Sequence, residues 1–214
     1  MTRNRLVVVL LVAIAACSSD STAPRAATSS ASSSGPTTTL STTTSSSVVA
    51  TIDPNAPEPN AAGDIPDNIA YVPFTFTAGP FSVTIPEGWA RVDASGTTTF
   101  TDKFNSAQLF AMSAGSAPTE QSARDTEVPA IQASSSNFKL ESITTITRKG
   151  GTAVLIRYTA DSAPNAVTGA IRPLAIERYE FWQNNKEGVI VLSGPVGADN
   201  VDPWRTISDS FAWS

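Results

Sequence analysis

The stretch RYEFWQNNKEGVIVLSGP, residues 178–195, contains two apolar runs separated by a polar turn at 184–187. Apolar residues alternate in one phase at Leu174 and Ile176 and in the other phase at Tyr179 and Phe181. This slip of one residue predicts a β-bulge within 171–183. The run that follows, 188–195, is apolar without alternation, which is typical of a strand buried on both faces. We therefore expect two long strands here.

Further strands are predicted on the N-terminal side of this stretch. In FSVTIPEGW, residues 81–89, apolar positions alternate before a Pro-Glu-Gly turn, so a strand should end there. Lys149-Gly150-Gly151 reads as a hairpin connection between strands at 139–148 and 152–158. The remaining strand candidates are TTTFTD at 97–102 and AQLFAMSA at 107–114.

Two helices are expected among these strands. In the last one, Asp202 would cap the helix, Pro203 suits its first turn, and an apolar stripe follows at helical spacing. The stripe is Trp204, Ile207, Ser208 and Phe211. A middle helix lies between Thr119 and Ser136, where Pro129 predicts either two pieces or a start near Thr126. The expected fold class is α+β, a mostly antiparallel β-sheet flanked by helices.

The N-terminus has the pattern of an export signal. Arg3 and Arg5 precede an uninterrupted apolar run, Leu6 to Ala16, which is about half as long as a bilayer-spanning helix. Residues 1–16 are therefore predicted to be a signal peptide. Ile14-Ala15-Ala16 leads directly into Cys17, the only cysteine, and this arrangement resembles the lipobox of bacterial lipoproteins.

The lipobox resemblance implies that Cys17 is lipidated. A diacylglycerol would be linked to the thiol, cleavage would follow Ala16, and the new amino group could be acylated, for instance with palmitate. The alternative is an ordinary signal peptide with an accidental cysteine, but a lone cysteine in an exported protein needs an explanation. We expect a lipid-anchored protein on the extracytoplasmic side of the cell membrane.

The chain divides by composition into a tether and a domain. Residues 17–68 are rich in Ser, Thr and Pro, with too little apolar surface to offset the entropy of ordering, so a disordered tether is predicted. It is either O-glycosylated or an unmodified spacer. Residues 69–214 form the expected single domain, which is long enough to bury a core of its own.

Composition excludes several function classes. The chain has no histidine and its one cysteine is assigned to the anchor, so His-based triads, Cys–His pairs and histidine metal sites are excluded. A net charge of −5 argues against nucleic-acid binding. Asp199 and Asp202 are close enough in the sequence to be considered as calcium ligands, but the spacing lacks a full oxygen-ligand loop. The favoured interpretation is a helix cap and a solvated turn. Glu177 is predicted to pair across strands with a basic residue rather than to join a second carboxylate.

Tryptophan is the one residue type left that could line a ligand site. Trp89 and Trp204 are expected in the core, and the same interpretation is favoured for Trp182, although aromatic rings also line sugar or lipid sites. Trp213, next to the C-terminus, is the candidate for surface exposure.

The order of elements resembles a known superfamily. The segments that carry the resemblance are FSVTIPEGW, YEFW, GVIVLSGP and the terminal WRTISDSFAW. Together, over residues 70–214, they are similar to the PsbP-like α/β/α sandwich superfamily and, within it, to the LpqN-type lipoproteins of actinobacteria. Its known members include an extrinsic photosystem II subunit and a Ran-binding factor. The resemblance implies an α/β/α fold and a role in binding proteins rather than in catalysis.

Two functions are therefore expected from the sequence. The first is a non-enzymatic binding module of the cell envelope, with an envelope protein as its partner and no cofactor. The second is a carrier or sensor of a small amphiphilic ligand, which requires an apolar pocket. A filled interface between sheet and helices would favour the first function, and an empty apolar cavity would favour the second.

Overall fold

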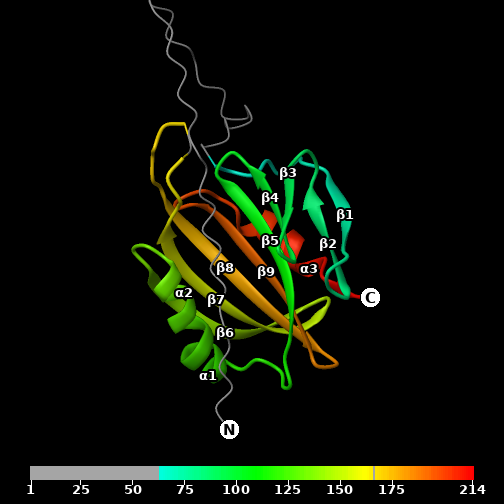
Figure 1. Cartoon of the computed structure of the whole chain (residues 1–214). Helices are drawn as coiled ribbons and strands as arrows, with labels where there is room; N and C mark the ends of the chain where they lie inside the picture. The colour runs from blue at the N-terminus through cyan, green and yellow to red at the C-terminus, as the bar shows by residue number, and fades with distance from the viewer. Residues whose placement is uncertain (1–62, 166) are drawn as a thin grey trace, which may run out of the picture. The chain divides into compact units, whose positions relative to one another are not determined.

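The two long strands predicted around residue 185 form the middle of a seven-stranded antiparallel sheet (Figure 1). The computed structural model describes residues 63–165 and 167–214. In it, β8 (Pro173–Gln183) pairs with β9 (Lys186–Pro195) through a turn at Asn184 and Asn185, both with positive φ. The strand order is β3-β4-β5-β9-β8-β7-β6. The other strands are β3 (Ala90–Ala94), β4 (Thr97–Asp102), β5 (Asn105–Ser113), β6 (Lys139–Arg148) and β7 (Gly151–Asp161).

A smaller sheet and a helix cover one face of this sheet. The smaller sheet contains β1 (Tyr71–Phe76), β2 (Phe81–Pro86) and the short β10 (Ala212–Trp213). The helix α3 (Val201–Asp209) contacts β2 and lies behind the large sheet in the view of Figure 1. Side chains from β2 and α3 form a buried cluster with those on the facing side of β5, β7, β8 and β9. This cluster is the main core, and the predicted strand at 81–89 is confirmed as part of it.

The middle helix covers the opposite face and contains two α-helical pieces, with Pro129 in the first turn of the second, as predicted; the π-turn that joins them was not predicted. It runs without a break through α1 (Glu120–Ser122), the π-helical turn η1 (Ala123–Glu127) and α2 (Val128–Ser134). A proline ring inside a regular α-helix would clash with the carbonyl four residues earlier. Here Pro129 follows a wider π-turn that displaces that carbonyl, so the helix continues through the proline.

The bulge predicted within residues 171–183 is wrong. The pairing of β8 with β7 and with β9 is continuous from Leu174 to Phe181. The apolar phase changes because both faces of β8 are covered: Tyr179 and Phe181 lie in the main core, and Ile176 packs under the middle helix. A register shift occurs instead in β6, between Leu140 and Ser142.

The terminal helix is confirmed, but its predicted cap is wrong. The residue at the N-cap is Asn200, whose side chain does not cap the helix, and Asp202 lies inside the first turn with Pro203. The predicted stripe is buried: Trp204, Ile207, Ser208 and Phe211 are all 8% exposed or less. The helix ends before Phe211, whose ring turns into the core.

These layers confirm the α+β class with a mostly antiparallel sheet flanked by helices. The main core extends to Ile65, which is 3% exposed and whose N–H donates to the side chain of Asn200 at 2.8 Å. Among the described helices, none has the length and apolar character needed to cross a membrane. Cys17, the predicted signal peptide and most of the predicted tether lie outside the described residues.

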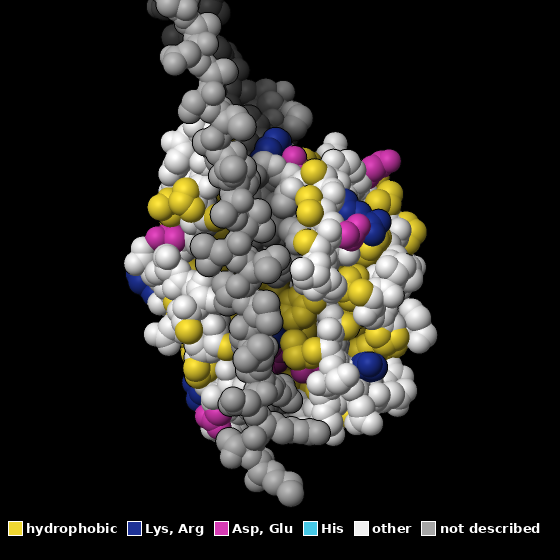
Figure 2. Space-filling view, viewed as in Figure 1, with side chains coloured by type: hydrophobic (Ala, Val, Ile, Leu, Met, Phe, Trp, Pro, Cys, Tyr) yellow, Lys and Arg dark blue, Asp and Glu magenta, His cyan; other side chains and the backbone are white. Residues whose placement is uncertain are grey.

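Charged side chains are interspersed on the face seen in Figure 2. Basic and acidic groups alternate there with apolar and uncharged polar surface, and no continuous basic stripe crosses the described part of that face. Nucleic-acid binders typically contact the phosphate backbone through a continuous surface of Lys and Arg side chains.

Candidate functional site

The acidic residues considered as calcium ligands do not form a site. Asp199 and Asp202 are both exposed, and the backbone N–H of Asp199 donates to the carboxylate of Asp64 at 2.9 Å. Within residues 63–165 and 167–214, no three acidic side chains lie close enough together to hold a metal ion.

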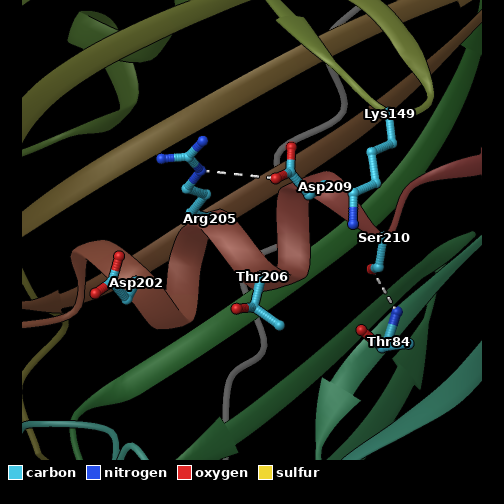
Figure 3. Close-up of a pocket in the computed structure, with 7 residues that line it drawn as sticks. All are labelled: Thr84, Lys149, Asp202, Arg205, Thr206, Asp209 and Ser210. Atoms are coloured by element: carbon cyan, nitrogen blue, oxygen red, sulfur yellow. Dashed lines mark hydrogen bonds and ion pairs between the residues drawn. The ribbon is translucent and has the colours of Figure 1, made fainter.

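Two hollows flank α3, one on each side, and Arg205 lines both. The first, with a volume of about 420 Å³, lies between α3, β2 and the β6–β7 turn and is drawn in Figure 3. Lys149 extends into it from the turn, next to Asp209 and Ser210 (Figure 3). The hydroxyl of Ser210 accepts a hydrogen bond from the backbone N–H of Thr84 at 2.7 Å and so joins α3 to β2.

The second hollow, which we call the α3 cleft, has a volume of about 460 Å³. It opens between α3 and the large sheet, at the side of β7 and β8. Its lining residues are Arg148, Arg157, Ala175, Glu177, Tyr179, Pro195, Ala198, Asn200, Val201, Trp204 and Arg205. Three of these are arginines and only one is acidic, although the chain as a whole carries a net charge of −5.

A hydrogen-bonded group of three residues forms the sheet side of the α3 cleft. Nε of Arg157 on β7 donates to the carboxylate of Glu177 on β8 at 2.6 Å, which confirms the predicted cross-strand pair. The hydroxyl of Tyr179 donates to the other oxygen of the same carboxylate. Burial, together with the neighbouring Glu177, raises the pKa of Tyr179 to about 12. Tyr179 therefore keeps its proton at neutral pH and remains a hydrogen-bond donor.

Two further arginines approach from the end of β6 and from α3. Nε of Arg148 donates to the hydroxyl of Ser208 at 3.0 Å, and its guanidinium lies 5.5 Å from the centre of the Tyr179 ring. Nε of Arg205 lies 3.7 Å from the carboxylate of Asp209, one turn further along α3. Asp209 also lies 3.7 Å from Nε of Arg148. One carboxylate therefore lies close to an arginine of β6 and to an arginine of α3.

The indole of Trp204 forms part of the cleft wall. The side chain is buried, as predicted, yet its Nε1 has no hydrogen-bond partner among the described residues. Most buried polar atoms are hydrogen-bonded, because leaving a buried donor unsatisfied costs about 1–3 kcal/mol. Nε1 of Trp204 is an exception to this rule.

The other tryptophans have structural surroundings. Trp89 is buried in the main core as predicted. Nε1 of Trp182, which is half-buried, donates to the carbonyl of Ala114 at 2.9 Å. Trp213 is half-buried rather than fully exposed and packs edge-on against Phe211, with ring centres 5.0 Å apart.

A second charged group lies on the opposite face of the sheet, beneath the middle helix. Nε of Arg178 donates to the carboxylate of Glu180 at 2.6 Å, and Glu127 in η1 lies 3.7 Å from another nitrogen of the same guanidinium. Glu180 is 1% exposed, and burial raises its pKa. The group is closed off by the helix, so we regard it as structural.

Sequence reasoning identified Glu177, Trp204 and Asp202 but not the arginines of the α3 cleft. Arg205 is far from Arg148 and Arg157 in the sequence, and the three share no motif. The signal that was present is local: Arg157 faces Glu177 across two paired strands.

Comparisons with known proteins give structural neighbours but no family. No protein-family model matches the chain, and no curated protein matches it. A solved structure from Bacteroides thetaiotaomicron shares 14% identity with a TM-score of 0.45. The match covers 66% of this chain, which spans about half the length (48%) of that one.

Two other neighbours belong to the structural group that the sequence resembles. The PsbP of the cyanobacterium Synechocystis shares 14% identity with a TM-score of 0.47, over 74% of this chain and 96% of its own. LpqN of Mycobacterium tuberculosis, described as involved in cell envelope biogenesis, shares 13% identity with a TM-score of 0.39, over 68% of this chain and 91% of its own. The structural neighbours of this chain thus include PsbP-like and LpqN folds at low sequence identity.

Proposed function

We propose that this protein is a membrane-anchored, extracytoplasmic lipoprotein of the LpqN type whose domain is a non-enzymatic binding module of the cell envelope. The pattern ending at Cys17 supports the anchor, and the Ser/Thr-rich segment after it supports a tether. The partner is an envelope protein, and no cofactor takes part.

The observation that carries the binding role is the filled interior on both faces of the sheet. Towards α3, the rings of Phe81, Phe181 and Phe211 stack with centres 4.0 to 4.9 Å apart and occupy the space between the layers. Under the middle helix, Val128 and Ile156 belong to a second buried cluster. Because the interior is occupied by the protein's own side chains, binding must take place at the surface, and the surface around α3 carries the grouped charges.

The anchor is tested by cell fractionation. Cys17→Ala should move the protein from the membrane fraction to the soluble extracytoplasmic fraction. Mass spectrometry of the wild-type protein should show loss of residues 1–16 and the added mass of acyl chains. A mature protein with the mass of unmodified amino acids would refute the anchor.

The partner is tested by photocrosslinking in intact cells. A photoreactive amino acid replaces Thr206, which is exposed on α3, or Glu141, which is exposed on β6 as a matched control. We expect a defined envelope-protein adduct from position 206 and none from position 141. Equal adducts from both positions, or none from either, would count against a binding surface at α3.

The α3 cleft supports a second candidate function, a carrier or sensor of a small amphiphile. Its volume of about 460 Å³ lies in the range of small-molecule sites, about 300–1,000 Å³. It is an open cleft at the surface and not an enclosed apolar cavity, so any ligand would remain partly in contact with water.

A further inference from the structure

We infer that the α3 cleft binds a small amphiphile whose polar end is an oxyanion, either a carboxylate or a phosphate ester. This inference deepens the second candidate function above and depends on it. Three features of the cleft carry it: an excess of guanidinium groups, the way in which these groups are held, and the apolar walls beside them.

The first feature is the charge of the lining. Arg148, Arg157 and Arg205 come from β6, β7 and α3, and the only acidic side chain that lines the cleft is Glu177. That carboxylate already accepts hydrogen bonds from Arg157 and Tyr179 on its two oxygens. Asp209, just outside the lining, lies 3.7 Å from Nε of both Arg148 and Arg205. Three guanidiniums thus face two carboxylates, and the cleft keeps one net positive charge, which attracts an anion.

The second feature is the tethering of two arginines through Nε. Arg157 meets Glu177 through Nε, and Arg205 meets Asp209 through Nε. Within the described part of the chain, the terminal Nη groups of these two side chains have no hydrogen-bond partner, and Figure 3 shows those of Arg205 pointing away from Asp209. A guanidinium presents its N–H groups in a planar fork that matches the two oxygens of a carboxylate or phosphate. Glu177 thus orients Arg157 while leaving its fork for a ligand. Asp209 lies beyond hydrogen-bond distance of the more exposed Arg205, so it attracts that guanidinium by charge alone.

The third feature is the apolar part of the lining. Ala175, Pro195, Ala198 and Val201 supply aliphatic surface, and the Trp204 ring adds an aromatic wall. An inorganic anion would leave this surface in contact with water, whereas a ligand with a short hydrocarbon chain would cover it. Covering apolar surface contributes about 25 cal/mol per Å².

Hydrogen-bond donors also outnumber acceptors in the cleft. The terminal Nη groups of Arg157 and Arg205 are the donors that face no partner among the described residues, whereas the hydroxyl proton of Tyr179 is already donated to Glu177. Nε1 of Trp204 is also without a partner among those residues, but it is buried within the wall. A ligand that offers only acceptors, as a carboxylate or a phosphate ester does, is complementary to such a lining.

The test uses the full-length lipidated protein in a neutral detergent, with ¹⁵N-labelled tryptophan. The probes are butyrate, butyl phosphate, inorganic phosphate and 1-butanol, the first two of which distinguish a carboxylate from a phosphate ester. The readout is the indole N–H resonance of Trp204, assigned by its loss in Trp204→Phe. A site with a Kd of about 1 mM would be nearly saturated at about 10 mM probe.

We expect butyrate or butyl phosphate to shift this resonance and to bind at least several-fold more tightly than inorganic phosphate or 1-butanol. Arg205→Gln and Arg157→Gln should each weaken binding by about tenfold, the scale of one charge-assisted hydrogen bond. The matched control is Arg91→Gln, because Arg91 also forms an exposed pair with an acid, Asp93 at 2.9 Å, but on β3. It should leave binding unchanged.

Three outcomes would overturn the inference. Binding of 1-butanol as tightly as the anions would refute the oxyanion while leaving a neutral carrier or sensor intact. Inorganic phosphate binding as tightly as butyl phosphate would refute the amphiphile. No shift of the Trp204 resonance with any probe would refute both the inference and the second candidate function. The first proposed function would not be affected, because crosslinking at Thr206 tests it separately.

Discussion

Replacing Phe211 with alanine should destabilise the domain more than any other single aromatic truncation that we consider. Phe211 is 1% exposed and follows the end of α3. Its ring stacks on Phe181 with centres 4.0 Å apart and planes 7° apart, and on Phe81 with centres 4.9 Å apart. The side chain therefore joins the C-terminal segment to both β-sheets.

The size of the effect follows from how little the site can collapse. A side chain on Gly150 or Gly188 would meet Phe211 within 3 Å, so the β6–β7 turn and β9 both approach the phenylalanine closely at glycine positions. Burying a phenylalanine in such a fixed slot is worth about 3–5 kcal/mol relative to alanine. Phe211→Ala should thus lower the free energy of unfolding by about 4 kcal/mol, a large share of the roughly 5–15 kcal/mol of a typical domain.

The assay is urea denaturation of the full chain, followed by tryptophan fluorescence and circular dichroism. Phe104→Ala is the matched control, because Phe104 is only half-buried and its ring packs under the guanidinium of Arg172 at 4.3 Å. The control should lose about 1 kcal/mol. A loss below about 1.5 kcal/mol for Phe211→Ala, or one equal to that of the control, would show that the aromatic stack does not hold the layers together.

Gly150→Ala would place a methyl group 2.3 Å from the carbonyl oxygen of Phe211 and should lower the free energy of unfolding by about 2 kcal/mol, whereas Gly115→Ala, in open space, should leave it nearly unchanged in the same urea titrations. Because the pKa of Tyr179 is raised to about 12, the folded state loses stability as pH rises from about 10 towards 12; Tyr179→Phe should flatten this alkaline decline, measured as urea midpoints against pH. Glu180→Gln would deprive a buried arginine of its 2.6 Å partner and should cost about 3 kcal/mol at pH 7, and an unchanged thermal midpoint would contradict this.

Much of the fold could be predicted because its strands carry strong local patterns. β4 was predicted with its observed ends at 97–102, and β6 with its observed ends at 139–148. The continuous apolar run at 188–195 predicted burial on both faces, which β9 shows. In each case the periodicity of the residues reflects the faces that the strand buries, and this information is present in the sequence itself.

The sequence-based predictions were wrong or incomplete where contacts between neighbouring elements determine the local structure. Along β8, an apparent change of phase arose because both faces of the strand are covered: Ile176 packs under the middle helix, and Tyr179 and Phe181 lie in the main core. A single strand does not reveal that two layers will cover it. At Pro129, the π-turn before the proline lets the helix continue where a regular α-helix would clash with the proline ring. At Asp202, the residue type suits a cap, but the helix begins one residue earlier.

The α3 cleft could not be predicted because it depends on topology. In the β6–β7 hairpin, Arg148 lies opposite Gly151 at the turn and Arg157 lies opposite Ser142, and both line the cleft with Arg205 from α3. The predicted hairpin places Arg148 and Arg157 on paired strands, but nothing in the sequence around them indicates Arg205. The alternation of side chains along a strand predicted a cross-strand ion pair for Glu177 without naming its partner; the partner is Arg157, and this contact also orients the guanidinium.

The start of the described chain is fastened to a wall of this cleft. Asn200 lines the cleft, and its amide donates to the carbonyl of Gly63 at 3.2 Å and to Asn105 at 3.0 Å, while Asn105 donates to the same carbonyl at 2.9 Å. Both asparagines are nearly fully buried, so losing one would leave several polar groups unsatisfied. Hydrogen bonds therefore join the backbone at Gly63 to the cleft wall at Asn200. If the chain is anchored at Cys17 as proposed, Gly63 is the first described residue on the anchor side of the domain, and its carbonyl is hydrogen-bonded to a residue that lines the cleft.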